Sequence, residues 1–182
     1  MERGLSNDRP VTRYLADDHR RLDTLLQVAV PSTGQMNQPI YDQFRAGLLR
    51  HIGMEEKILL PTAQRLRGGE PLTLAAKLRL DHGAIAALLM PTPTDEIIAL
   101  LRTILSTHNL LEEGPGGFYE TCDTLATSAH EQLIAQLSRA PEVTVLPHSD
   151  TPAVLGAVRR AVERAGYEFS RVPVASGPNQ HE

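Results

Sequence analysis

The stretch His-Ile-Gly-Met-Glu at residues 51–55 places an imidazole and a carboxylate four residues apart, and His-Asn-Leu-Leu-Glu at 108–112 repeats that spacing. On an α-helix, residues i and i+4 lie on one face, so each motif directs its two polar groups toward the same point. Each motif follows a further histidine that comes directly after an aspartate, at residues 18–19 and 81–82. The chain therefore carries the pattern His, His-x-x-x-Glu twice.

The segments around these motifs predict an all-α protein, because leucine and alanine dominate them and alternating strand-like runs are nearly absent. We expect helices over about 10–30, 39–66, 71–90 and from 94 to the breaker Gly-Pro-Gly-Gly at 114–117. Asn7 or Asp8 can cap the first helix and Thr94 the fourth, and Pro61 should bend the second. On each helix the motif residues fall within the apolar stripe that should face the core.

Burial of so many ionisable groups is the decisive feature of the pattern. A single histidine on an apolar stripe is more often a hydrogen-bonded core residue, but a buried carboxylate without a partner costs several kcal/mol. Four imidazoles and two carboxylates exceed the four ligands of a structural zinc and suit two metal ions bridged by carboxylates. Hydrogen-bonded His–Glu pairs without metal are the alternative. The candidate metal ligands are His19, His51, Glu55, His82, His108 and Glu112.

The sequence does not decide the role of four carboxylates that stand next to these candidates. Asp18 and Asp81 could accept hydrogen bonds from imidazole N–H groups of the site, or they could be solvated surface residues. Glu56 and Glu113 are expected to be solvated or to support the ligands, and in an enzyme either could serve as proton donor. His130 is expected at the surface with no role.

Composition narrows the class of protein. Of the 182 residues, 41% are hydrophobic and 22% charged, which is typical of a soluble globular chain, and the net charge of −4 offers no footprint for nucleic acid. No apolar run approaches the roughly 18 residues of a membrane span, and the N-terminus lacks the apolar stretch of a secretory signal. With one cysteine, Cys122, which we expect to be a packing residue, these features favour a cytoplasmic setting.

The C-terminal part of the chain continues the helical pattern. A further helix is expected over 118–138, followed by an irregular segment at 141–147 and a short amphipathic helix over about 152–165. The expected organisation is therefore a metal-binding bundle over 8–138, an extension over 139–171 and a disordered tail over 172–182.

The ordered motif His, His-x-x-x-Glu, His, His-x-x-x-Glu resembles the hemerythrin-like family, also called the HHE cation-binding domain. The flanking sequences 15–22, 51–61 and 108–113 strengthen the likeness, which covers about residues 8–138. The resemblance implies an up-down-up-down four-helix bundle around a non-haem di-iron centre. It further implies that His19 and His51 hold one iron, that His82 and His108 hold the other, and that Glu55 and Glu112 bridge them with an oxo, hydroxo or water ligand.

The sequence departs from oxygen-carrying hemerythrins at two places. Those proteins have a fifth histidine one turn before the histidine of the third helix, where this chain has Leu78, and they end with a differently spaced carboxylate, where this chain has Glu112. Fewer histidines leave room for exogenous ligands at both metals. The ferritin-like motif Glu-x-x-His is absent, because Leu48, Arg79 and Leu105 stand three residues before the three later histidines.

The leading hypothesis is a di-iron protein that binds or senses O2, NO or peroxide at an open metal position. Alternatives are a di-iron oxidoreductase, such as a peroxidase, catalase-like protein or NO scavenger, and an iron storage or delivery protein. Manganese could replace iron, since mixed imidazole and carboxylate donors tolerate several metals. No nucleic-acid or membrane partner is expected, and the C-terminal extension could contact a partner protein.

Overall fold

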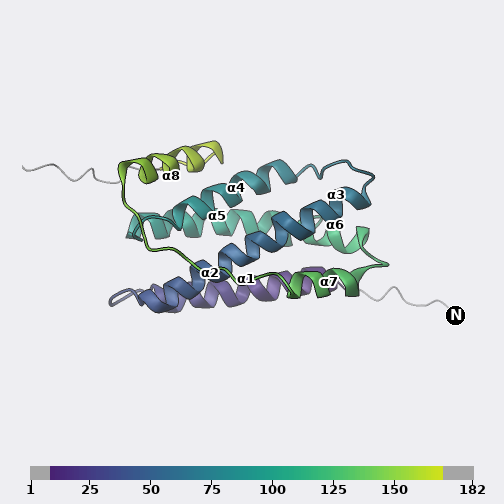
Figure 1. Ribbon diagram of the computed structural model, residues 1–182, viewed down its shortest axis with the longest axis horizontal. Coiled ribbons are helices and arrows are strands. Elements are labelled where there is room, and N and C mark those ends of the chain that lie inside the picture. The colour runs from purple at the N-terminus through teal and green to yellow at the C-terminus, as the bar shows by residue number, and fades with distance from the viewer. Residues whose placement is uncertain (1–8, 170–182) are drawn as a thin grey trace, which may run out of the picture.

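The computed structural model describes residues 9–169, and all of the regular secondary structure in that range is helical, which confirms the all-α class. The elements, shown in Figure 1, are α1 (Pro10–Ala29), α2 (Gln38–Met54), the π-helix η1 (Glu55–Leu59), α3 (Leu60–Leu66), α4 (Ala75–Leu88), α5 (Asp95–Glu113), α6 (Phe118–Leu125), α7 (His130–Ser138) and α8 (Pro152–Arg164).

The long helices pack side by side. Helix α1 packs on α2 and α4 on α5, while α5 and α6 both contact α1. In Figure 1 the elements α2, η1 and α3 follow one line. The chain reverses direction between α1 and this line, again between this line and α4, and again between α4 and α5. Helix α8 lies on α4, and α7 packs on α1 and η1.

The apolar core consists of two clusters at opposite ends of the helices. One cluster contains residues such as Phe44, Leu101 and Val162 and includes the packing face of α8. The other contains residues such as Leu15 and Phe118 and lies under α6 and α7. On α1, α2, α4 and α5 the candidate ligands lie where one cluster gives way to the other, so the polar groups are enclosed from both ends.

Polar side chains accept hydrogen bonds from the first backbone N–H groups of α5 and α1, and in α1 the side chain comes from a distant helix. Thr94 caps α5 by accepting from the Ile97 N–H, as predicted. The expected caps Asn7 and Asp8 lie outside the described residues. The first turn of α1 instead receives the buried carboxylate of Asp123 from α6, which accepts from Val11 N at 2.9 Å and Thr12 N at 3.0 Å. A carboxylate at this end of a helix also complements the helix dipole.

The second long helix is interrupted by a π turn rather than simply bent at Pro61. In η1 the Leu60 N–H bonds to the Glu55 carbonyl, five residues back, and α geometry resumes at α3. Pro61 falls in the first turn of α3, where a missing N–H is best tolerated. Such π turns often occur at functional sites, and this one begins at a candidate ligand.

The single helix expected over 118–138 is wrong, because the structure has a turn between α6 and α7. Thr127 Oγ1 donates to the Thr124 carbonyl at 2.8 Å, and His130 Nε2 contacts the Asp123 carbonyl at 2.8 Å. Side chains that bond to nearby carbonyls compete with the helical pattern and end it.

The C-terminal extension is held against the bundle. Arg45 on α2 donates to the carbonyls of Leu89 and Leu146 at 3.0 Å, which anchors the irregular segment before α8. Helix α8 occupies the range expected for the amphipathic helix and buries Val158 and Val162 in the core. The disordered tail expected over 172–182 lies outside the described residues.

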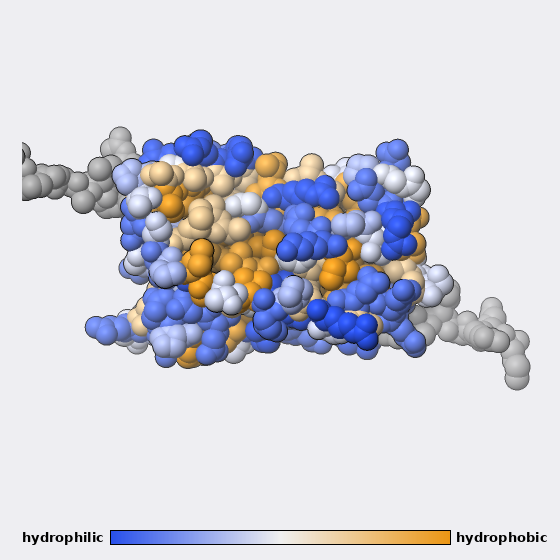
Figure 2. Space-filling view, viewed as in Figure 1, coloured by the Kyte–Doolittle hydropathy of each residue, from blue (hydrophilic) through white to orange (hydrophobic). Residues whose placement is uncertain are grey.

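The surface of the described residues is mixed in character. On the face in Figure 2, hydrophilic residues surround apolar ones that gather between the lower and upper helices. None of the helices within residues 9–169 combines the length and the apolar character needed to cross a bilayer.

Candidate metal centre

The structure brings all six candidate ligands together. Each is buried, with Glu55 and Glu112 fully inaccessible and His19 the most accessible at 7%. They come from α1, α2, η1, α4 and α5, and the two His-x-x-x-Glu pairs approach the centre from α2–η1 and α5. His130 lies elsewhere, against Asp123, and His148 lies against Gln38, so neither is among the residues brought together here.

The ligand atoms form two groups that share both glutamates. His19 and His51 make the first group with Glu55 and Glu112, and His82 and His108 make the second group with the same two residues. Within each group the atoms lie within 4.8 Å of one another, so either group could hold a metal ion.

Each glutamate presents one oxygen to each group. Glu55 Oε1 lies 3.5 Å from His51 Nε2 in the first group, whereas Glu55 Oε2 lies 3.1 Å from His82 Nε2 in the second. Glu112 repeats this division, with Oε2 at 3.5 Å from His19 Nε2 and Oε1 at 3.1 Å from His108 Nε2. Two carboxylates oriented in this way can bridge a pair of cations.

Two of these oxygens are only partly compensated. Glu55 Oε2 and Glu112 Oε1, both facing the second group, make no well-aligned hydrogen bond among residues 9–169, although each lies 3.1 Å from an imidazole nitrogen, His82 Nε2 and His108 Nε2 respectively. A buried carboxylate oxygen has lost its hydration, and a poorly aligned neighbour replaces that hydration only in part. A cation in the second group would supply what these oxygens lack.

The four carboxylates whose role the sequence leaves open all lie near Nδ1, the ring nitrogen on the side of each histidine that faces away from the centre. Asp18 Oδ2 lies 2.9 Å from His51 Nδ1, and Asp81 Oδ2 lies 3.5 Å from His108 Nδ1, which is too far for a good hydrogen bond. Each aspartate therefore faces the second histidine of its own half. A carboxylate that accepts from the outer N–H fixes the ring and leaves Nε2 directed at the centre.

The glutamates that follow the ligands connect the two halves. Glu56 Oε1 lies 2.6 Å from His82 Nδ1, and Glu113 Oε1 lies 2.5 Å from His19 Nδ1. Both contacts are with the outer sides of the rings, so neither carboxylate points into the centre as a proton donor would. Together with the aspartates they give every candidate histidine ligand an acidic neighbour.

These acidic neighbours hold protons on the histidines. Burial opposes the charged ring, but Glu55 and Asp18 outweigh it and raise the pKa of His51 to about 10. The same opposition of burial and carboxylates raises the pKa of His82 to about 11 and that of His108 to about 9. For Glu55 burial favours the neutral form, yet His51 and His82 hold its pKa well below the ordinary value. A metal ion must displace these protons.

Sequence analysis missed one residue of the site, Tyr119 on α6. Its fully buried hydroxyl donates to Glu55 Oε1 at 2.6 Å and lies 3.1 Å from Glu112 Oε2. The same oxygen is 3.2 Å from His19 Nε2 and 3.2 Å from His51 Nε2. A signal existed in the sequence, since a tyrosine on an apolar stripe needs a partner for its hydroxyl and Tyr119 closely follows Glu112.

The glycine-rich breaker is what turns Tyr119 back to the centre. Gly116 has φ of +70°, which suits glycine, and a Cβ at Gly117 would lie 2.7 Å from the Glu112 carbonyl oxygen. The chain can therefore reverse tightly after α5 and start α6 at Phe118. Cys122, one turn further along α6, is buried and packs in the core as expected.

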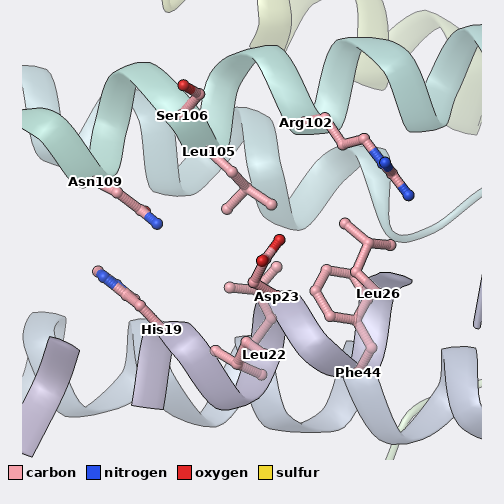
Figure 3. A pocket seen from close by; sticks show the side chains of 10 residues that line it. His19, Leu22, Asp23, Leu26, Phe44, Arg102, Leu105, Ser106 and Asn109 are labelled. Atoms are coloured by element: carbon pink, nitrogen blue, oxygen red, sulfur yellow. The ribbon is translucent and has the colours of Figure 1, made fainter. Parts of the chain in front are cut away.

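A pocket of about 350 Å³ adjoins the centre at His19. Its walls come from α1, α2 and α5, and Figure 3 shows His19 and Asn109 facing one another across it, with Leu22, Leu26 and Phe44 on the α1–α2 side. Asp23, Arg102 and Ser106 contribute polar groups to its lining. The pocket is large enough for a small molecule and reaches a candidate ligand.

Comparison of the chain with protein-family models, curated protein sequences and solved structures finds no match. The interpretation of the site therefore depends on its own residues and their geometry.

Proposed function

We propose that the chain is a hemerythrin-like protein whose up-down-up-down bundle holds two iron ions. His19 and His51 would hold one ion, His82 and His108 the other, and Glu55 and Glu112 would bridge them. The protein would bind or sense O2, NO or peroxide at an open metal position.

One observation carries this proposal: the two glutamates each direct one oxygen toward each pair of histidines, and the oxygens facing His82 and His108 have no other partner among residues 9–169. The metal-free alternative, a core of hydrogen-bonded His–Glu pairs, would be expected to align these contacts, but the 3.1 Å contacts to His82 and His108 do not form well-aligned hydrogen bonds. The shared carboxylates also favour two ions over one.

The donor chemistry fits the proposed metal. Imidazole nitrogen and carboxylate oxygen together suit iron, and they also accept manganese. When bound, the ions would supply open coordination positions and, for iron, electrons for redox chemistry. The chain would hold three of the ligand rings through the outer carboxylates of Asp18, Glu56 and Glu113, while Asp81 lies 3.5 Å from the fourth ring, that of His108.

The pocket beside His19 supports a small ligand. Its apolar walls suit a diatomic gas, and the polar groups at Asp23 and Arg102 would also admit peroxide. Because the remaining ligands are enclosed by the two apolar clusters, this pocket is the approach to the centre that we propose.

Metal content tests the proposal directly. The protein loaded anaerobically with Fe²⁺ should retain about two ions per chain after desalting. His51→Ala and His108→Ala should lower this content sharply, whereas His130→Ala, which removes a histidine outside the centre, should not. Equal loss from all three variants, or no retention by the unmodified protein, would rule out the ligand assignment.

Addition of NO to the ferrous protein, or of O2 or peroxide, then tests ligand binding through changes in the visible spectrum. Continued consumption of excess peroxide, measured against the His108→Ala variant, would indicate turnover and favour the oxidoreductase alternative. A single stoichiometric spectral change would favour binding or sensing.

A further inference from the structure

The two halves of the centre differ in one group, the hydroxyl of Tyr119. In the first group this oxygen lies 2.6 to 3.2 Å from all four ligand atoms, on His19, His51, Glu55 and Glu112. In the second group no hydroxyl among residues 9–169 takes this place, and each corresponding glutamate oxygen lies 3.1 Å from a histidine Nε2 without a well-aligned hydrogen bond. The internal repeat of the sequence is thus broken at this place.

A phenol alone does not satisfy these neighbours. It has one proton, which goes to Glu55 Oε1 at 2.6 Å and leaves Glu112 Oε2 facing the same oxygen at 3.1 Å. Ligation through Nε2 also requires neutral rings, and the histidines then turn lone pairs toward the phenol. Once these rings are neutral, five electron-pair donors surround a single proton and repel one another, and a cation among them removes that repulsion.

The spacing matches a coordination shell. With metal–ligand bonds of about 2.1 Å, neighbouring donors at right angles are about 3.0 Å apart and opposite donors about 4.2 Å. The Tyr119 oxygen lies at neighbouring-donor distances from all four atoms, and those four lie within 4.8 Å of one another. The phenol oxygen thus lies at the distances expected of a fifth donor to the same ion.

We propose that Tyr119 is a fifth protein ligand of the ion held by His19 and His51. The inference rests on the proposed metal centre and deepens it. On coordination the phenol O–H bond breaks, an oxygen–metal bond forms, and the proton leaves to solvent with no change of oxidation state. Among residues 9–169 no corresponding hydroxyl faces the ion that His82 and His108 would hold.

The fold keeps Tyr119 in this place. Its ring is fully buried and packs against the rings of Phe118 and His19, with both centroids 5.7 Å away. A side chain at Gly117 would collide with the backbone of the preceding turn and displace the start of α6, so this tight turn requires glycine. The oxygen is therefore pre-positioned for a metal ion.

The visible spectrum of the ferric protein tests this proposal. A phenolate bound to Fe³⁺ absorbs visible light by charge transfer from oxygen to iron, and excitation in that band enhances the Raman modes of the phenolate ring. The iron-loaded protein should show both features, and Tyr119→Phe should lose them. Tyr41→Phe is the matched control, because Tyr41 is equally buried but its hydroxyl contacts none of the candidate ligands.

The outcomes separate this inference from the proposed function. Loss of the band in Tyr119→Phe, with iron retained or reduced to one ion, supports coordination. An unchanged spectrum in a Tyr119→Phe protein that still holds two ions overturns the inference but leaves the di-iron proposal intact. Failure of the unmodified protein to hold iron overturns both. If Tyr119→Phe does not fold, the unmodified protein labelled with ring-deuterated tyrosine provides the test. The enhanced Raman modes must shift in frequency on labelling, and a spectrum without enhanced tyrosine modes refutes coordination.

Discussion

Loading the metal-free protein with two metal ions should release about three protons per chain from its histidines at pH 7. The count follows from His51, His82 and His108, whose pKa values of about 10, 11 and 9 keep them charged at neutral pH. Each must lose its Nε2 proton to become a ligand. Coordination by Tyr119 would add one proton, which the Tyr119→Phe variant removes.

This release makes the affinity strongly dependent on pH. Three displaced protons correspond to roughly a 1000-fold change per pH unit in the product of the two binding constants, or about 4 kcal/mol. Binding should therefore strengthen from pH 7 to pH 8 and level off above about pH 11, where the histidines are already neutral.

Anaerobic calorimetric titration with Fe²⁺ measures the number of protons. Titrations at pH 7 in two buffers with different heats of ionisation give the protons released per ion bound, and the metal content of the product gives the stoichiometry. His130→Ala should leave the count unchanged, because His130 contacts none of the candidate ligands. Release of fewer than about two protons with both ions bound would show that the acidic neighbours do not charge these histidines.

Three other results are expected. The metal-free protein should lose stability as pH rises from about 6.5 to about 11, since a histidine whose pKa is raised from 6.5 stabilises the folded chain fully below 6.5, progressively less above it, and not at all above the raised value; urea unfolding at pH 7 and pH 11 measures this, and equal stabilities would contradict it. Asp123→Ala should lower the free energy of unfolding by about 1 to 2 kcal/mol in urea titrations, because the first turn of α1 loses its acceptor. Leu105→Trp should fill the pocket and slow NO binding in stopped-flow measurements at unchanged metal content; an unchanged rate would place the route elsewhere.

The i, i+4 spacing explains why the buried cluster of candidate ligands could be predicted from the sequence. The separation of His51 from Glu55 and of His108 from Glu112 places each pair on one helix face, wherever that helix packs. The apolar residues around each pair then determine that this face is buried, because exposing it would leave a hydrophobic stripe in water. The all-helical class and the burial of the candidate ligands are therefore local properties that the chain carries in its residue order.

The acidic shell and Tyr119 depend on contacts that no local pattern encodes. Asp123 reaches α1 across more than 100 residues, and Glu113 contacts a histidine 94 residues away, so both pairings require the packed arrangement of the helices. The sequence shows that Glu56 and Glu113 follow ligands, but only the packing brings them to rings of the opposite half. Tyr119 likewise enters the first group because the turn at 114–117 sends α6 back along α1, and the direction of a reversal is decided by what the returning helix can bury.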